Sequence, residues 1–197
     1  MEAPFQKHKI NGSSSCHSDE GRIWAQMLLS MSNVVMEKAE YHFGFEVYGS
    51  SNELSAADSA LIEAARKVTA KAYAPYSNFR VGAVAKLKNG ETIAGTNQEN
   101  ASYPVGICAE RALLASASML HTGVPIDTIA ISYNNINGES NKPISPCGMC
   151  RQYLAEYETR MNQPIRLILS GMQGQVYVLE KASQLLPLSF GGDDLKG

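Results

Sequence analysis

The sequence lacks an excess of basic residues. Its 197 residues include 17 lysines and arginines against 19 aspartates and glutamates, which gives a formal net charge of -2. Proteins that bind polynucleotides draw much of their affinity from basic side chains on phosphates. The charge balance therefore argues against a nucleic-acid partner and suits a small neutral ligand better.

The sequence also lacks an apolar run long enough to cross a membrane. The segment from Ile23 to Met36 is apolar, but it is shorter than the roughly 20 residues that a spanning helix needs, and polar residues interrupt it. Asp19 and Glu20 precede it and no cleavage-like site follows, so it does not fit a secretion signal. We expect no membrane association.

Cysteine is scarce, with four residues in the whole chain. Three of them lie in two short motifs, Cys108-Ala109-Glu110-Arg111 and Pro146-Cys147-Gly148-Met149-Cys150, whereas Cys16 lies in a polar stretch rich in glycine and serine. This clustering does not indicate a disulfide framework. It is typical of a protein in a reducing compartment, so we expect a cytoplasmic location.

Residues 1–36 differ in character from the rest of the chain. The stretch from Met1 to about Arg22 carries Gly12-Ser13-Ser14-Ser15 and no apolar periodicity, which predicts disorder. The remaining length fits one domain with an ordinary apolar content. We expect a leader over residues 1–36, disordered or outside the main domain, and a single catalytic domain over residues 37–197.

Strand and helix patterns alternate through this domain. Apolar residues alternate with others from Tyr41 to Val47, which predicts a half-buried strand. Ser55 begins a helix with Asp58 at the capping-box position, and Pro75 ends it. Asn89-Gly90 predicts a hairpin. Later patterns predict helices near 109–120, 147–158 and 182–186, and strands near 126–133, 165–169 and 176–179. Together they favour an α/β sandwich.

The two cysteine motifs predict the ligands for one metal ion. Catalytic zinc takes three protein ligands and keeps a fourth position for water, whereas structural zinc sites have four ligands. Cys108, Cys147 and Cys150 make three, and helix N-termini at both motifs favour their thiolates. We therefore predict a catalytic Zn²⁺ ion, which lowers the pKa of its bound water to about 7. Glu110, two residues after a ligand, is the predicted proton shuttle.

The Cys147-x-x-Cys150 spacing also occurs in redox sites and in structural zinc knuckles. No second Cys-x-x-Cys pair completes a four-thiol shell, and Cys108 and Glu110 supply the other half of a catalytic site. The catalytic interpretation is therefore favoured. Three thiolates leave such a site net negative, and Arg111 is suited to draw charge from the sulfurs.

Cys-x-Glu followed by Pro-Cys-x-x-Cys resembles the signature of zinc nucleobase deaminases. Three more segments, Ala74–Val81, Thr96–Tyr103 and Leu185–Gly191, extend the resemblance to the homotetrameric cytidine deaminase family. The resemblance covers roughly Glu53 to Leu195. It implies a three-layer α/β/α sandwich with a mixed central sheet of about five strands.

The same resemblance implies a reaction in pyrimidine salvage. Cytidine and 2′-deoxycytidine are hydrolysed to uridine and 2′-deoxyuridine with release of ammonia. Glu110 shuttles protons while zinc-bound hydroxide attacks C4 of the base. The relative preference for the two nucleosides stays open.

The resemblance also assigns the substrate contacts. Asn97 and Glu99 match residues that bind the ribose hydroxyls. Phe79 matches a residue beside the base, and the backbone of Ala109 lines the base. Phe190 matches a phenylalanine that reaches into the neighbouring subunit's site, so we expect a homotetramer.

Other classes of protein share parts of this pattern. Blasticidin-S-type deaminases share the three-cysteine pattern but lack the motif that stands here as Asn97 to Asn100. Polynucleotide deaminases more often have histidine in place of Cys108. A non-enzymatic zinc module or a redox protein remains formally possible. The sequence leaves open whether Tyr76 and Tyr103 line the site.

Overall fold

The computed structural model describes residues 36–196. The predicted disorder of Met1–Arg22 falls outside this range, as does the apolar segment before Met36. Residues 44–196 form one compact unit, which contains all the helices and strands described below, and the described residues up to Phe43 belong to a separate unit. The predicted domain boundary at residues 36 and 37 stays a prediction. No helix within residues 36–196 has the length and apolar content to cross a membrane.

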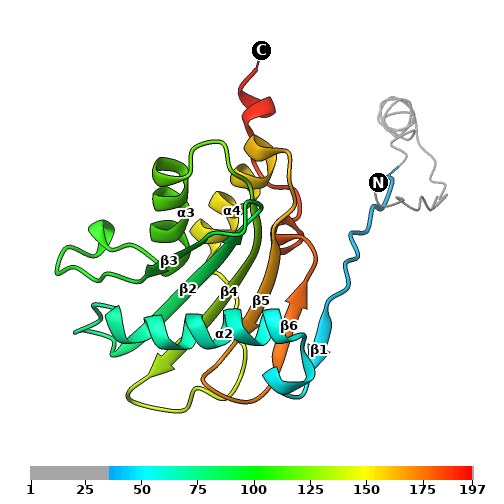
Figure 1. Cartoon of the computed structure of the whole chain (residues 1–197). Helices are drawn as coiled ribbons and strands as arrows, with labels where there is room; N and C mark the ends of the chain where they lie inside the picture. The colour runs from blue at the N-terminus through cyan, green and yellow to red at the C-terminus, as the bar shows by residue number, and fades with distance from the viewer. Residues whose placement is uncertain (1–35, 197) are drawn as a thin grey trace, which may run out of the picture. The chain divides into compact units, whose positions relative to one another are not determined.

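A six-stranded mixed sheet forms the centre of the larger unit (Figure 1), in the order β1-β6-β5-β4-β2-β3. The β4–β5 pair is parallel and every other neighbouring pair is antiparallel. The mixed sheet is confirmed, with six strands where about five were expected. The strands are β1 Glu46–Tyr48, β2 Phe79–Leu87, β3 Thr92–Thr96, β4 Ile126–Asn135, β5 Arg166–Ser170 and β6 Val176–Leu179.

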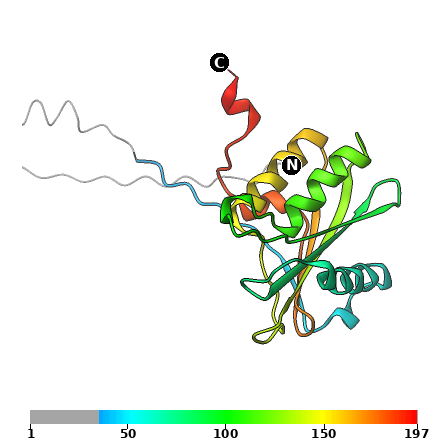
Figure 2. The same cartoon turned by 90° about the vertical axis from the view of Figure 1, so that its left-hand side faces the viewer.

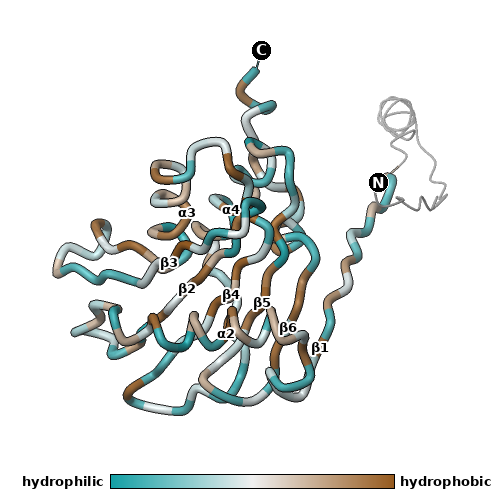
Figure 3. Tube along the Cα trace, viewed as in Figure 1, coloured by the Kyte–Doolittle hydropathy of each residue, from teal (hydrophilic) through white to brown (hydrophobic). Residues whose placement is uncertain are grey.

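Helices cover both faces of this sheet, as the three-layer prediction requires. Helix α2 (Ala56–Val68) packs on one face, and helices α3 (Ala109–Leu120) and α4 (Gly148–Met161) pack on the other (Figure 2). The central strands carry much of the apolar sequence (Figure 3). Each face has its own core, because alternate residues of a strand point to opposite sides. Val84 and Ile168 pack with α2, whereas Ala83 and Leu167 pack with α3 and α4.

Helix α2 begins as its sequence predicts. The Ser55 hydroxyl accepts a hydrogen bond from the Asp58 backbone N–H at 3.1 Å, which satisfies one of the unpaired donors at the helix start. The Asp58 carboxylate, however, binds Arg166 on β5 at 2.8 Å. The predicted capping box is therefore only half formed, because a cation on the sheet takes the carboxylate.

The strand predicted from Tyr41 to Val47 is wrong in its extent. β1 contains only Glu46–Tyr48, which pair with three residues of β6. β6, the strand that pairs with β1, ends at Leu179, opposite the position of Phe45. An alternating pattern needs a hydrogen-bonding neighbour to become a strand. Phe45 instead packs its ring against Tyr177, with centroids 5.1 Å apart.

The predicted Asn89-Gly90 hairpin is confirmed and places β3 beside β2. Gly90 has φ +89°, a left-handed conformation that glycine adopts without steric cost. Farther along β3, a Cβ atom at Gly95 would lie 2.4 Å from the carbonyl oxygen of Ala109. The missing side chain lets the first turn of α3 pack directly on the β3 backbone, and this contact sets the position of Cys108.

Candidate metal centre

The three cysteines lie at the N-termini of two neighbouring helices. Cys108 is the N-cap residue of α3, Cys147 is the N-cap residue of α4, and Cys150 lies in the first turn of α4. The Sγ atom of Cys147 is 3.8 Å from that of Cys108 and 3.4 Å from that of Cys150. All three sulfurs lie within 4.8 Å of one another. The fold therefore assembles the predicted ligand set.

These sulfur separations fit a single zinc ion. Tetrahedral zinc with Zn–S bonds of about 2.3 Å keeps its sulfurs about 3.8 Å apart. The observed separations of 3.4 and 3.8 Å are close to that value. Three thiols leave one position of the shell open, as catalytic zinc requires. Within residues 36–196 this is the only group of three histidine, cysteine or acidic side chains arranged to hold a metal.

The thiols are electrostatically unequal. A hydrogen bond from Cys150 is the main cause that lowers the pKa of Cys108 to about 5, and Cys147 and Arg111 lower it further. The pKa of Cys150 is raised, chiefly because its thiol proton is held by Cys108. A thiolate is thus favoured at the start of α3, where the helix dipole also favours negative charge.

Glu110 lies in the first turn of α3 and is only 5% exposed. Burial is the main cause that raises the pKa of its carboxyl, and the charge of Cys108 raises it further. A buried carboxyl with a raised pKa is suited to both accept and donate protons near neutral pH. This placement supports the predicted proton shuttle.

Arg111 lies next to Cys108, and its charge is among the causes that lower the pKa of that thiol. Its Nη2 atom donates to the carbonyl oxygen of Gly106 at 3.0 Å. Its Nε atom is buried and has no hydrogen-bond partner among the described residues. The placement suits the predicted role of drawing charge from the sulfurs, which stays a prediction.

Asn97 follows the end of β3 and holds the first residues of β2. Its Oδ1 atom accepts a hydrogen bond from the Val81 N–H at 2.7 Å, and its Nδ2 atom donates to the Phe79 carbonyl at 2.8 Å. The side chain therefore braces β2. Because the oxygen has a second lone pair and the amide a second hydrogen, it also retains hydrogen-bonding capacity for a ligand.

Glu99 braces the turn that precedes β2. Its carboxylate accepts hydrogen bonds from the backbone N–H groups of Tyr76 at 2.9 Å and Ser77 at 3.3 Å, and from the Ser77 hydroxyl. The hydroxyl hydrogen bond is the main cause that lowers the pKa of Glu99. The carboxylate is thus ionised at neutral pH and available as an acceptor. Its predicted ribose contact, like that of Asn97, stays a prediction.

The aromatic residues near the predicted site differ in exposure. Phe79 is half-buried and stacks on Tyr133, with ring centroids 4.8 Å apart. Tyr76 and Tyr103 are exposed and form an edge-to-face pair with each other at 6.2 Å. Phe190 is 58% exposed in this single chain.

Ala109, by contrast, is fully buried at the start of α3. The substrate contacts predicted for Phe79, Ala109 and Phe190 stay predictions.

The structure also shows two residues that the sequence analysis did not single out. Arg151 and Gln152 follow Cys150 directly and form hydrogen bonds to the C-terminal segment. Their adjacency to a metal ligand is the signal that marks them in the sequence.

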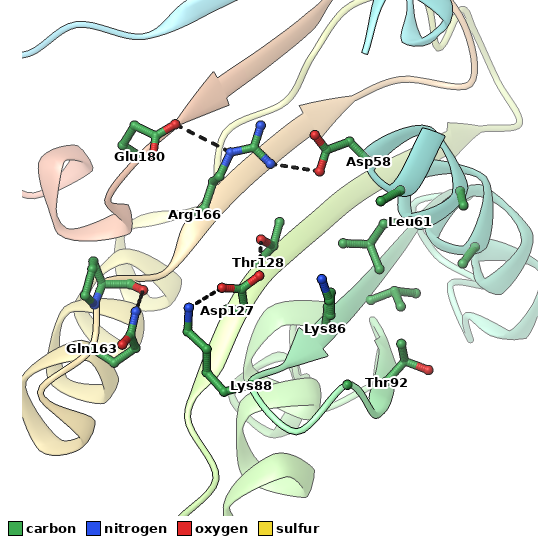
Figure 4. Close-up of a pocket in the computed structure, with 16 residues that line it drawn as sticks. Asp58, Leu61, Lys86, Lys88, Thr92, Asp127, Thr128, Gln163, Arg166 and Glu180 are labelled. Carbon is green, nitrogen blue, oxygen red and sulfur yellow. Dashed lines mark hydrogen bonds and ion pairs between the residues drawn. The ribbon is translucent and has the colours of Figure 1, made fainter. Parts of the chain in front are cut away.

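A hollow of about 520 Å³ lies beside α2, on the sheet face away from α3 and α4 (Figure 4). Most of its charged side chains are paired, Arg166 with Asp58 and Glu180 and Lys88 with Asp127. It contains none of the predicted site residues. A second hollow, of about 620 Å³, is lined mainly by residues of α3 and α4, including Arg111 and Gln152. The three thiols and Glu110 belong to the starts of these two helices, so the predicted chemistry lies on the face of the sheet that α3 and α4 cover.

An α/β/α fold with three thiols at two helix N-termini and a buried glutamate beside them defines a zinc hydrolase that activates water. The family model described as cytidine and deoxycytidylate deaminase zinc-binding region matches residues 55–162. The chain belongs to this cytidine and deoxycytidylate deaminase family. The matched region includes the three cysteines and Glu110, but it ends before Phe190.

Individual relatives agree with the family model. The cytidine deaminase of Halalkalibacterium halodurans is 36% identical over 135 residues, which are 68% of this chain and 95% of the relative. A Mycobacterium tuberculosis cytidine deaminase is 34% identical over 134 residues, 66% of this chain and 87% of the relative. The crystal structure of a Burkholderia pseudomallei cytidine deaminase matches with a TM-score of 0.58 and 43% identity, covering 66% of this chain and 97% of that one.

We expect the purified protein to contain about one zinc ion per chain, because three thiols form one three-ligand site. Cys147→Ala should lose most of this zinc and the activity with it. Metal analysis by plasma mass spectrometry, combined with an activity assay, checks both. Cys16→Ala, the same change outside both motifs, should retain the zinc. Full activity in a metal-free preparation would contradict the assignment.

Proposed function

We propose that this protein hydrolyses cytidine and 2′-deoxycytidine to uridine and 2′-deoxyuridine, releasing ammonia. The observation that carries this proposal is the convergence of three thiols with the buried carboxyl of Glu110 at the start of α3. The names of the relatives support the substrate class, since they are cytidine deaminases that this chain matches over most of their length.

Cys108, Cys147 and Cys150 would hold the zinc ion, which when bound would lower the pKa of a water ligand to about 7 and so supply a nucleophile at neutral pH. Glu110 takes one proton from the attacking water and delivers it to N3 of the ring as the oxygen adds to C4. It then takes the proton of the new C4 hydroxyl and delivers it to the amine, so the C4–N bond breaks, ammonia leaves and C4 keeps the oxygen as a carbonyl. The same carboxyl carries the proton in every transfer, because its raised pKa allows it both to accept and to donate a proton.

The neighbouring residues bind and orient the nucleoside. Glu99 and Asn97 bind the ribose hydroxyls, because both retain free acceptor positions beyond the hydrogen bonds that brace β2 and the turn before it. Phe79 packs beside the base, and the backbone at Ala109 lines it. Arg111 offsets the negative charge of the three thiolates.

The quaternary structure is a homotetramer in which Phe190 of one protomer completes the site of its neighbour. Support comes from the exposure of the C-terminal segment, where Leu188 is 99% and Phe190 is 58% exposed. Apolar side chains that exposed are typical of an interface. The protein acts in the cytoplasm, where thiols that bind a metal stay reduced.

The activity is tested directly by incubating the zinc-loaded protein with cytidine and following the fall in absorbance as uridine forms. Glu110→Gln should retain zinc but lose about 10²- to 10⁴-fold in kcat, the usual contribution of general acid–base catalysis. The amide keeps the size of the side chain but cannot carry the proton. Near-normal turnover in this variant would show that another residue moves the protons.

Glu99→Gln should lower kcat/KM for cytidine by about 10- to 150-fold, because a hydrogen bond to a charged group contributes about 1.5–3 kcal/mol. Activity on free cytosine, which has no ribose, should change little. Ser77→Ala is the control, because it removes the hydroxyl bond to Glu99 but leaves the carboxylate in place. Equal losses in both variants would indicate that Glu99 acts only by bracing the turn.

Phe190→Ala should raise KM for cytidine by about two- to tenfold, since an aromatic contact contributes about 0.5–1.5 kcal/mol beyond area burial. Zinc content should not change. Light scattering of the unmodified protein should give the mass of four chains. A fully active monomer would rule out the shared site.

A further inference from the structure

The helix that carries two of the three thiols also holds the C-terminal segment. Gln152 and Arg151 occupy the two positions of α4 directly after Cys150. The Nε2 atom of Gln152 donates to the carbonyl oxygen of Phe190 at 2.7 Å. The Nη1 atom of Arg151 donates to the carbonyl oxygen of Leu185 at 3.1 Å. Two consecutive side chains therefore bind the segment at both ends of residues 185–190.

The guanidinium of Arg151 joins this segment to the loop that presents Cys147. Its Nε atom donates to the Pro146 carbonyl at 2.8 Å, and its Nη2 atom donates to the Ser145 hydroxyl at 3.1 Å. A guanidinium is a planar group with donors in fixed directions, so three such bonds restrict its acceptors to one arrangement. The loop before Cys147 and the start of the C-terminal segment are thereby held together.

Few other hydrogen bonds hold the segment beyond Leu185. Within the described residues, the bond from Gln152 is the only hydrogen bond between residues 186–196 and any residue before Ser183. The other bonds of residues 186–196 are local, such as the one from the Gly191 N–H to Asp194. The position of Phe190 relative to helix α4 of its own chain therefore depends strongly on Gln152.

We propose that Gln152 and Arg151 are positioning residues, which hold the C-terminal segment on α4 so that the Phe190 ring is presented to the substrate in the neighbouring subunit's site. This inference rests on the proposed role of Phe190 in binding the base. Gln152 contacts the backbone of Phe190 and not the reacting atoms, so its contribution appears in substrate affinity and not in the chemical step. The sequence motif at Cys150 thus continues into the residues that place the aromatic ring.

Gln152→Met tests this role, because methionine keeps the length of the side chain but has no N–H donor. KM for cytidine should rise about two- to tenfold, the range for loss of one net hydrogen bond, while kcat and zinc content stay unchanged. Hydrogen exchange of residues 186–196 should become faster, while exchange within α4 stays the same.

Gln163→Met is the matched control. Gln163 follows the far end of α4, and its Nε2 atom donates to the Pro164 carbonyl at 3.1 Å (Figure 4). The substitution removes the same kind of bond from the opposite end of the helix, so KM should not change.

Arg151→Lys tests the second residue, because lysine keeps the positive charge but lacks the planar guanidinium and its several donors. This variant should have a higher KM for cytidine and should lose zinc to a chelator faster. An Arg151→Lys protein with neither change would overturn the role of Arg151.

A double-mutant cycle with Phe190→Ala decides between this inference and its alternatives. If Gln152 acts through Phe190, the double variant should have the same KM as Phe190→Ala alone. Additive effects on KM would overturn the positioning role and leave the proposed function intact. The same conclusion would follow if KM were unchanged in Gln152→Met but raised in Phe190→Ala. Unchanged KM in Phe190→Ala would instead overturn the shared site itself.

Discussion

The site depends on two helix N-termini meeting at one end of the sheet, close enough for three sulfurs to lie within 4.8 Å. Strand topology makes this possible. β3 and β4 both pair antiparallel with β2, so they run in the same direction. The helices that follow them, α3 and α4, therefore begin at the same end of the sheet. Their aligned N–H groups and dipoles face the thiols and favour the thiolate form.

Close backbone packing between helices and strands fixes the position of the helix that carries Cys108 and Glu110. Gly95 on β3 lies against the carbonyl of Ala109, and Gly82 on β2 lies against the carbonyl of Ala65, each so near that a Cβ atom would approach to 2.4 Å. α3 and α2 therefore rest directly on the strands, on opposite faces. A helix seated in this way has little freedom to slide, and Cys108 and Glu110 share its fixed position.

Helix α4 organises the later part of the chain from both of its ends. At its start it carries Cys150 and the two side chains that bind the C-terminal segment. Near its other end, the buried carboxylate of Glu158 accepts hydrogen bonds from the backbone N–H groups of Ile165, Ala182 and Ser183 at 2.7, 2.9 and 3.1 Å. The chain before β5 and the 3-10 turn after β6 are thus tied to the helix that supplies two metal ligands.

Features with a local cause were determined by the sequence itself. The Asn89-Gly90 turn, the Ser55 cap and the two cysteine motifs each depend on residues a few positions apart, so short-range chemistry predicts them. Features that need a distant partner were decided only by the tertiary structure. β1 consists only of the three residues that pair with β6. Asp58 binds Arg166, 108 positions away, in place of closing its capping box. Gln152 reaches the Phe190 carbonyl across 38 positions. The hydrogen bond or ion pair in each case depends on where the fold places the second residue, which no local pattern specifies.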